Sequence, residues 1–292
     1  MAYRFRKKDR SVQKGVRRIG AEQVGKAIST IDEQGDQATA VHEVRKRCKE
    51  LRGLLRLVGP NFEAYADENA EFRDIGRLLG GVREVKVLED TFAKLAPRCP
   101  QITPPAQHRF RRALEARHPS PSASERLAQA RERLAGARSR ITGWTLAADD
   151  WAAIGPGLMH TLIHARAALE RIGGSHAPGL HHELRKQVKY HWHHLRLLRP
   201  IAPKEIKRRA ELANELGDRL GDHHDLATLE AALRGDRTVL GSVHEADALE
   251  AFARHERISQ EEETLRLARE LLAESAESLT ERLGAEWESW RN

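Results

Sequence analysis

The sequence has few aromatic residues, few cysteines and no long apolar run. Aromatic residues make up 5 % of the chain, which counts against a β-sandwich and against RNA-binding platforms that stack bases on rings. The two cysteines, Cys48 and Cys99, cannot form a disulfide framework and fit a reducing cytosol. No segment approaches the roughly 18 apolar residues of a membrane span, and the N-terminus lacks the apolar core of a signal peptide. We therefore expect a cytoplasmic protein that does not enter a membrane.

The charge of the chain is unevenly placed. The 292 residues are 32 % charged and carry a net charge of +7. Residues 1–60 hold 15 Lys/Arg and 7 Asp/Glu, whereas residues 244–292 hold 6 and 13. This asymmetry is compatible with an ordinary solvated surface and an acidic terminal helix, or with a basic site built by particular helices.

The hydrophobic pattern predicts helices throughout and no strand. Apolar residues recur at spacings of three and four, as in amphipathic helices. Breaks are expected at Gly59-Pro60, over 97–107 and over 143–157, where glycine and proline gather. The main helices are expected near 12–31, 39–58, 62–79, 125–141, 158–172, 180–198, 203–220, 222–234, 244–258 and 260–290, with a further one starting near 82. The predicted fold class is all-α.

An internal repeat divides the chain. Residues 42–49 (HEVRKRCK) match residues 182–189 (HELRKQVK) at five of eight positions, with an offset of 140. A second match, at an offset of 141, pairs residues 79–84 (LGGVRE) with residues 220–225 (LGDHHD). Two matches at nearly one offset predict two similar helical halves, 1–142 and 143–292, within a single domain.

The repeated helices carry their positive charges on one face. At about 100° per residue, the cationic face of the first is expected to hold His42, Arg45, Lys46, Lys49, Arg52 and Arg56. That of the second is expected to hold His182, Arg185, Lys186, Lys189, His193 and Arg196. The opposite face of each helix is expected to hold an apolar stripe that enters the core: Val44, Cys48, Leu51, Leu55 and Val58 in the first, and Leu184, Val188, Leu195 and Leu198 in the second. No acidic residue is expected on either face, so the like charges would repel one another unless an anion binds. From residue 42 to residue 56 the row extends about 21 Å, which suits a linear polyanion better than one small phosphate.

The H-x-x-R-x-x-x-K pattern at His42, Arg45 and Lys49, repeated at His182, Arg185 and Lys189, resembles the CHAD domain, the "conserved histidine α-helical domain". The resemblance extends over about residues 10–285. It implies two four-helix bundles related by a pseudo-twofold, with a basic central channel. It also implies non-catalytic binding of inorganic polyphosphate, often at polyphosphate granules, with no cofactor and no metal.

The resemblance also assigns individual residues. Arg52 extends the first motif, and Arg83 matches an arginine of the following element, although its neighbour here is Glu84. In the second half Trp192 and His224 stand at the positions equivalent to Arg52 and Arg83, so this half is expected to bind more weakly or with a stronger dependence on pH. Supporting contacts are expected from Lys14, Arg17, Arg18, Arg166, Lys207 and Arg208.

Two other functions remain open at this point. His224-Asp225 is a His-Asp doublet of the kind used by metal-dependent phosphohydrolases, and nearby histidines could supply more ligands. Against this, the repeat partner of the doublet is Arg83-Glu84, and the positive charge of its arginine would repel a metal ion. A nucleic-acid binder is compatible with basic helices, but no helix-turn-helix or zinc-finger spacing is present. The sequence does not predict the oligomeric state.

Overall fold

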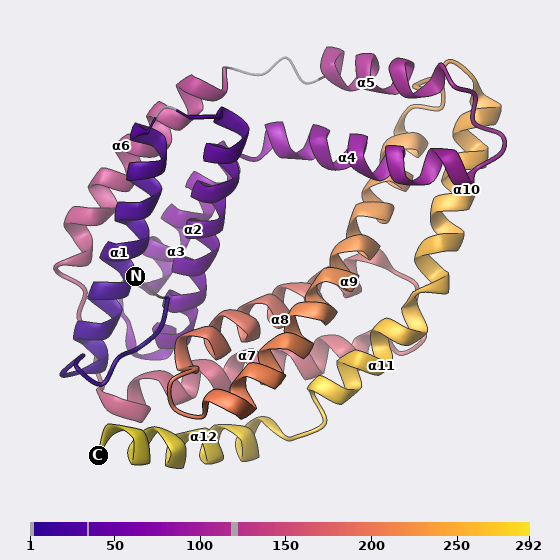
Figure 1. The fold of residues 1–292 in the computed structure, drawn as a ribbon. Helices are drawn as coiled ribbons and strands as arrows, with labels where there is room; N and C mark the ends of the chain where they lie inside the picture. The colour runs from indigo at the N-terminus through magenta and orange to yellow at the C-terminus, as the bar shows by residue number, and fades with distance from the viewer. Residues whose placement is uncertain (1–2, 34, 118–121) are drawn as a thin grey trace.

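The computed structural model describes residues 3–33, 35–117 and 122–292, and within them it is all-helical (Figure 1). This confirms the predicted fold class. The longer helices of residues 1–142 are α1 (Val12–Asp32), α2 (Gln37–Val58), α3 (Tyr65–Leu78), α4 (Gly81–Leu95), α5 (Ala106–Arg117) and α6 (Ala123–Ile141). The remainder are α7 (Asp150–Ile172), α8 (Pro178–Leu198), α9 (Pro203–Gly235), α10 (Val243–Ser259), α11 (Glu261–Leu271) and α12 (Ala276–Arg291). No helix of this described part is both long and apolar enough to cross a membrane.

The apolar faces of these helices pack into two separate cores. The larger core joins α1, α2, α3 and α6 to α7, α8, α11, α12 and the first half of α9. The smaller core joins α4 and α5 to α10 and the second half of α9. The helices of residues 1–142 are therefore shared between the two cores, because α4 and α5 pack on helices from the C-terminal part of the chain. A division of the chain at residue 142 stays a prediction.

Helix α7 begins eight residues before its expected start. Pro156 lies inside the helix, where it cannot donate a hydrogen bond to the carbonyl of Ala152, four residues earlier. The side-chain amide of Asn61 donates to that carbonyl instead, at 2.9 Å. Gly157 lies against the C-terminal end of α2, where a Cβ would be 2.0 Å from the carbonyl oxygen of Leu57. The Gly-Pro-Gly run is therefore a packing contact within a helix and not a break.

Two further boundaries differ from the predicted ones. Helix α9 runs unbroken from Pro203 to Gly235, although a boundary was expected near residue 221. Gly221 is buried within the helix, so the glycine serves close packing there. The C-terminal region expected to be one helix over 260–290 is divided into α11 and α12, because Ser275 caps a new helix by accepting a hydrogen bond from the backbone N–H of Ser278 at 3.0 Å.

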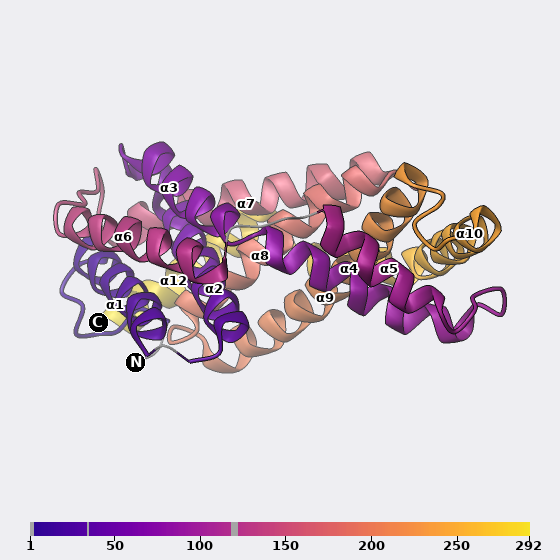
Figure 2. The ribbon, with the colours of Figure 1, turned by 90° about the horizontal axis from the view of Figure 1, so that it is seen from above.

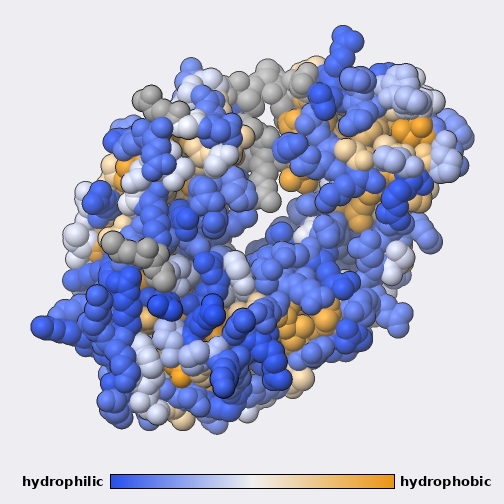
Figure 3. Space-filling model, viewed as in Figure 1, coloured by the Kyte–Doolittle hydropathy of each residue, from blue (hydrophilic) through white to orange (hydrophobic). Residues whose placement is uncertain are grey.

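The helices surround an opening. Seen from above, α1, α3 and α6 lie at one end of an elongated molecule and α5 and α10 at the other (Figure 2). The space-filling view shows a hole through the molecule, and the coloured residues on its border are mostly hydrophilic (Figure 3). In the same view of the ribbon this hole lies between α2, α4 and α9 (Figure 1).

Candidate anion-binding site on α2, α8 and α9

Helix α2 has the two faces that its sequence predicts. The carboxylate of Asp36 caps its start by accepting a hydrogen bond from the backbone N–H of Thr39 at 2.8 Å. The predicted apolar stripe is buried in the larger core: Val44, Cys48, Leu51, Leu55 and Val58. On the opposite face His42, Lys46 and Lys49 are exposed, while Arg45, Arg52 and Arg56 are partly buried.

The partly buried arginines of α2 are held against α3. Arg45 donates a hydrogen bond from Nη1 to the carbonyl oxygen of Gly76. Arg52 donates from Nε to the side-chain oxygen of Asn69 at 3.1 Å. These contacts orient the guanidinium groups, so that less side-chain entropy would be lost on binding an anion.

Helix α8 places the second motif against α9. The rings of His182 and His224 lie 4.6 Å apart between centroids. The guanidinium of Arg185 lies beside Gly221, where a Cβ would be 3.1 Å from Nη2. Lys189 crosses Gly217 in the same way and reaches Asp218, with Nζ 2.8 Å from Oδ1. Glycines of α9 thus lie beside the arginine and the lysine of the second motif, and His224 lies beside its histidine.

The same relationship occurs in the first half. A Cβ on Gly80 would be 3.3 Å from Nη1 of Arg45. The Leu-Gly pair that follows each motif therefore places a glycine beside the motif arginine in both halves. This contact explains why the two repeated sequence signals, about forty residues apart, occur together.

Helices α2 and α8 cross where the two cationic rows approach each other. A Cβ on Gly53 of α2 would lie 2.6 Å from the Cβ of His193. Tyr190 of α8 accepts a hydrogen bond from Nη2 of Arg52 at 2.8 Å, and its ring lies 4.5 Å below the guanidinium of Arg56. Cations from the first half therefore contact the second half directly.

His193 lies at this crossing and is not on the exposed cationic face. Its side chain is 6 % exposed. Burial lowers the pKa of His193 well below its usual range, and the charges of Arg196, Lys189 and Lys49 lower it further. His193 is therefore neutral. The motif lysines of both halves are near enough to act on this one buried ring.

Arg196 also has a structural partner. Its Nη2 lies 3.0 Å from Oε1 of Glu50, a carboxylate with no exposed surface. Arg47 pairs with the other oxygen of Glu50 at 2.9 Å. The guanidinium of Arg196 also packs over the rings of Tyr3 and Trp192, at 5.0 and 4.6 Å. The expected exposed position of His193 is therefore corrected, because α2 covers it. Arg196 is 30 % exposed and combines this partner with its predicted place on the cationic face.

Acidic residues neutralise part of each cationic face, contrary to expectation. Lys46 pairs with Glu43 and Lys186 pairs with Glu183, each at 3.0 Å. A glutamate three residues before a lysine can reach it along the helix surface. The unbalanced charge of these faces is consequently smaller than the sequence pattern indicated.

The two histidines of the second motif region are half-buried. Burial lowers the pKa of His182, and the charges of His224, Lys186 and Arg185 lower it further. Burial and Arg185 lower the pKa of His224. Both rings are therefore neutral at pH 7 unless a bound anion raises their pKa.

The supporting cations fall into two groups. Arg17 donates to the carbonyl of Trp144 at 2.6 Å, and Arg18 pairs with Asp9 at 2.6 Å. Arg166 donates to the carbonyls of residues 272–274, which directly follow α11. These three arginines hold the fold together. Lys14, Lys207 and Arg208 are exposed, and Lys207 lies 3.7 Å from Glu211. The side chain of Arg83 lies outside the described part of the structure.

The structure also brings in residues that the sequence pattern did not predict. Tyr190 and Asn69 contact the motif arginines, but neither stands at a repeated position. The spacing of residues along one helix cannot predict such contacts, because they depend on how α2, α3 and α8 pack. Within the described residues, His224 and Asp225 do not belong to a metal-ligand cluster; the one such cluster contains His181, His223 and Glu261.

Comparison with known proteins identifies the family of this arrangement. A protein-family model described as CHAD domain matches residues 19–234, which include both motifs and both Leu-Gly elements and end before α10. This range is shorter than the expected 10–285. No curated protein and no solved structure matches the chain. Since the match covers more than half of the 292 residues, the chain belongs to the CHAD domain family.

Proposed function

We propose that this protein binds inorganic polyphosphate without catalysis. The binding surface, here called the basic surface, consists of the motif cations and their neighbours: His42, Arg45, Lys49, Arg52 and Arg56 of α2, His182, Arg185 and Lys189 of α8, and His224 of α9. Arg83 of α4 is a further candidate. Membership of the CHAD family supports this function.

The contact between the two rows carries the proposal. Arg52 donates to Tyr190, and the guanidinium of Arg56 lies 4.5 Å from the centre of its ring. The row on α2 therefore meets α8 at this crossing, next to Lys189. We infer that a chain of phosphates passes from α2 to α8 here.

The chemistry of the side chains fits a polyanion. Arginine can hold two phosphate oxygens at once, and lysine acts as a point charge. Each guanidinium has five N–H donors in a fixed planar arrangement, and that of Arg52 is oriented by its bonds to Asn69 and Tyr190. About 21 Å of α2 separates the ends of its row, so the surface is long enough for several phosphate units.

We further propose that the basic surface lines the opening in Figure 3 as a basic channel between two pseudo-twofold-related halves. The positions of the repeated helices along the chain, and one contact that recurs in both halves, support this symmetry. Helices α2 and α8 start 141 residues apart and end 140 residues apart. In both halves the motif arginine lies beside the glycine of the Leu-Gly pair.

Calorimetric titration with polyphosphates of graded length tests the proposal. Wild-type affinity should rise with polymer length until the basic surface is filled. The R45E/K49E variant should bind at least 100-fold more weakly, with an unchanged helical circular-dichroism spectrum. The control variant R138E/R254E makes the same change of charge at exposed positions of α6 and α10 and should bind like wild type. Equal loss in both variants would contradict the proposal.

The non-catalytic part and the cellular location need separate tests. Incubation with polyphosphate and divalent cations should release no more phosphate than the R45E/K49E variant releases. Duplex DNA at the same salt concentration should not displace polyphosphate. In cells, a fluorescent fusion of the wild-type chain should gather at polyphosphate granules, and the R45E/K49E fusion should not.

A further inference from the structure

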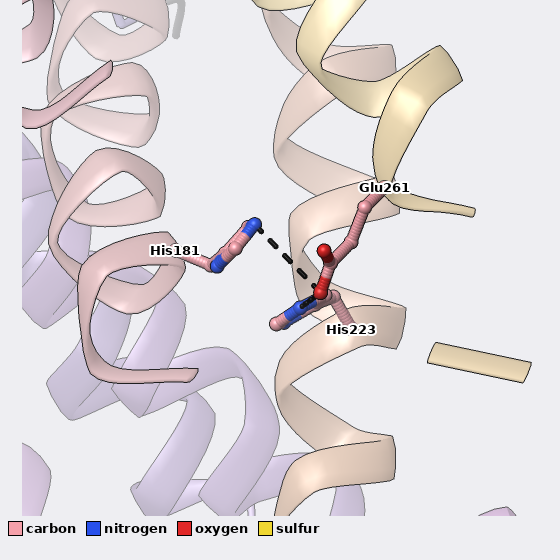
Figure 4. A group of neighbouring side chains, drawn as sticks. All are labelled: His181, His223 and Glu261. Atoms are coloured by element: carbon pink, nitrogen blue, oxygen red, sulfur yellow. Dashed lines mark hydrogen bonds and ion pairs between the residues drawn. The ribbon is translucent and has the colours of Figure 1, made fainter. Parts of the chain in front are cut away.

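A buried cluster of metal-ligand side chains lies behind the basic surface. His181 of α8, His223 of α9 and Glu261, the first residue of α11, point toward one another (Figure 4). Their side chains are enclosed, with 0 %, 3 % and 5 % of each residue exposed. The cluster thus joins α11 to the consecutive helices α8 and α9.

The distances are close to those around a small metal ion. Nε2 of His223 lies 3.0 Å from Oε1 of Glu261, and Nε2 of His181 lies 4.0 Å from the same oxygen. One ligand atom from each residue lies within 4.8 Å of the other two. Bonds of about 2.0–2.2 Å in tetrahedral geometry separate ligand atoms by about 3.4 Å, so shifts of less than about 1 Å would complete the site.

The hydrogen bond of His181 leaves its other nitrogen available as a ligand. Nδ1 lies 3.2 Å from the carbonyl oxygen of Ala177, and a carbonyl can only accept, so Nδ1 carries the hydrogen. In the neutral ring Nε2 then presents a lone pair toward the carboxylate of Glu261. Among the described residues this buried Nε2 has no hydrogen-bond partner. Metal-bound histidines commonly donate their second N–H to a backbone carbonyl in this way.

The net charge of the described groups around the cluster is compatible with a bound cation. The buried guanidinium of Arg257 pairs with Glu230 at 2.6 Å and with Glu261 at 3.0 Å. Two carboxylates thus share one described guanidinium, which leaves one negative charge if the histidines are neutral. Nη1 of Arg257 also lies 3.3 Å from Nε2 of His223. A metal ion therefore requires this guanidinium to release Glu261 and His223, while it keeps Glu230 and the carbonyl of His176, at 3.1 Å.

We propose that His181, His223 and Glu261 bind one divalent transition-metal ion of the Zn²⁺ type, with His176 as a fourth ligand. Nδ1 of His176 already contacts Oε2 of Glu261, and its half-exposed side chain provides a route of entry. Three histidine nitrogens with one carboxylate oxygen suit Zn²⁺ better than Mg²⁺ or Ca²⁺. Because His181, His223 and Glu261 are buried, this is a structural site that fastens α11 to α8 and α9.

The site is specific to one half of the chain. At the repeat offsets of 140 and 141, the positions of His181 and His223 are occupied by Val41 and Val82. Glu261 lies beyond residues 19–234, the range that matches the family. The metal site is therefore distinct from the two repeated motifs.

Titration of the full chain with Co²⁺ and Zn²⁺ after chelator treatment tests the proposal. Wild type should bind one ion, Co²⁺ should give the strong visible absorption of a four-coordinate site, and Zn²⁺ should raise the melting temperature. H181Q and E261Q should each weaken binding at least 100-fold. H164Q, which changes an exposed histidine of α7, should bind like wild type.

The wild-type titration decides the outcome even if a variant fails to fold. The absence of stoichiometric Co²⁺ binding by wild type would overturn the proposal. Undiminished binding by a folded H181Q variant would overturn it equally. Polyphosphate is absent from these experiments, so their result does not depend on the proposed function.

Discussion

Lys189 passes directly over Gly217, where a Cβ would lie 2.7 Å from its Cε. The lysine comes from the second motif on α8 and the glycine from α9. The ammonium group can reach Asp218 and the ring of Trp192, 5.2 Å away, only because α9 has no side chain at residue 217. A small residue on one helix thus determines the position of a cation on the next.

Gly217→Ala should displace Lys189 and weaken polyphosphate binding several-fold. The lysine end is flexible, so we expect the free energy of unfolding to change by less than about 1 kcal/mol, since alanine also favours the helix. Gly25→Ala is the matched control, because a Cβ there meets nothing within 4 Å. It should stabilise the protein by about 0.5–1 kcal/mol and leave binding unchanged. Equal affinities of the two variants in calorimetry would exclude this role for Gly217.

Gly157→Ala should strongly destabilise the fold. Its Cβ would overlap the carbonyl oxygen of Leu57, a backbone atom that can move only with the end of α2. Overpacking of this kind costs about 1–3 kcal/mol and sometimes more. Urea unfolding followed by circular dichroism would measure the loss, and Gly179→Ala, which meets nothing within 4 Å, serves as the control. A wild-type midpoint for Gly157→Ala would show that α2 and α7 do not pack this closely.

Arg196→Ala should lower stability more than affinity. Removing this guanidinium takes one partner from the buried carboxylate of Glu50 and opens its packing on Tyr3 and Trp192. Arg47 remains as a partner and Arg196 is partly exposed, so we expect a loss of about 1–2 kcal/mol. Chemical unfolding and calorimetry on the same samples would separate the effects. A large loss of polyphosphate affinity at unchanged stability would show that Arg196 contributes to binding and not mainly to the fold.

Acid should destabilise the protein through the buried histidines of α8. Burial lowers the pKa of His191, His193 and His194, to about 3 for His194. His194 contacts the carbonyl of Gly53 at 3.1 Å, and Arg209 donates to Nε2 of His191 at 3.2 Å. The contact with Arg209 requires a neutral His191, whose Nε2 accepts, whereas Nε2 of His194 donates to the Gly53 carbonyl and burial keeps that ring neutral.

In the unfolded chain these histidines bind protons below about pH 6.5, whereas in the folded chain they stay neutral. The free energy of unfolding should therefore be insensitive to them above pH 7. Below pH 6.5 it should fall by up to about 1.4 kcal/mol per pH unit for each ring, until the folded-state pKa is reached. Urea unfolding between pH 7.5 and pH 5 would measure this slope. His194→Gln should reduce the slope, and an identical slope in that variant would contradict the assignment.

Polyphosphate affinity should fall steeply as salt concentration rises. Binding to a row of lysines and arginines releases condensed counterions, as nucleic acids do when they bind proteins. Calorimetry at several salt concentrations would give the slope, and removing one cation, as in Lys49→Gln, should make the slope shallower. A salt-independent affinity would exclude the electrostatic mechanism.

The periodicity of the sequence predicted the local features well. The apolar stripes of α2 and α8 are buried as expected, because one helix alone determines which residues share a face. The roles of individual cations were harder to predict. His193 lies on the expected face of α8, yet α2 covers it at Gly53. Arg166 has a plausible position in sequence, yet it caps the end of α11, 106 residues later. Such contacts depend on the packing of distant helices, which periodicity does not contain.

Helix α9 takes part in both hydrophobic cores. Its Leu216 and Leu220 lie in the larger core, and its Leu229 and Leu233 lie in the smaller one. Its 33 residues form a rod about 50 Å long with no proline after its first turn. Because both cores include side chains of this one helix, α9 connects them along one border of the opening (Figure 1). A ligand that entered the opening would therefore lie beside a helix that is anchored in both cores.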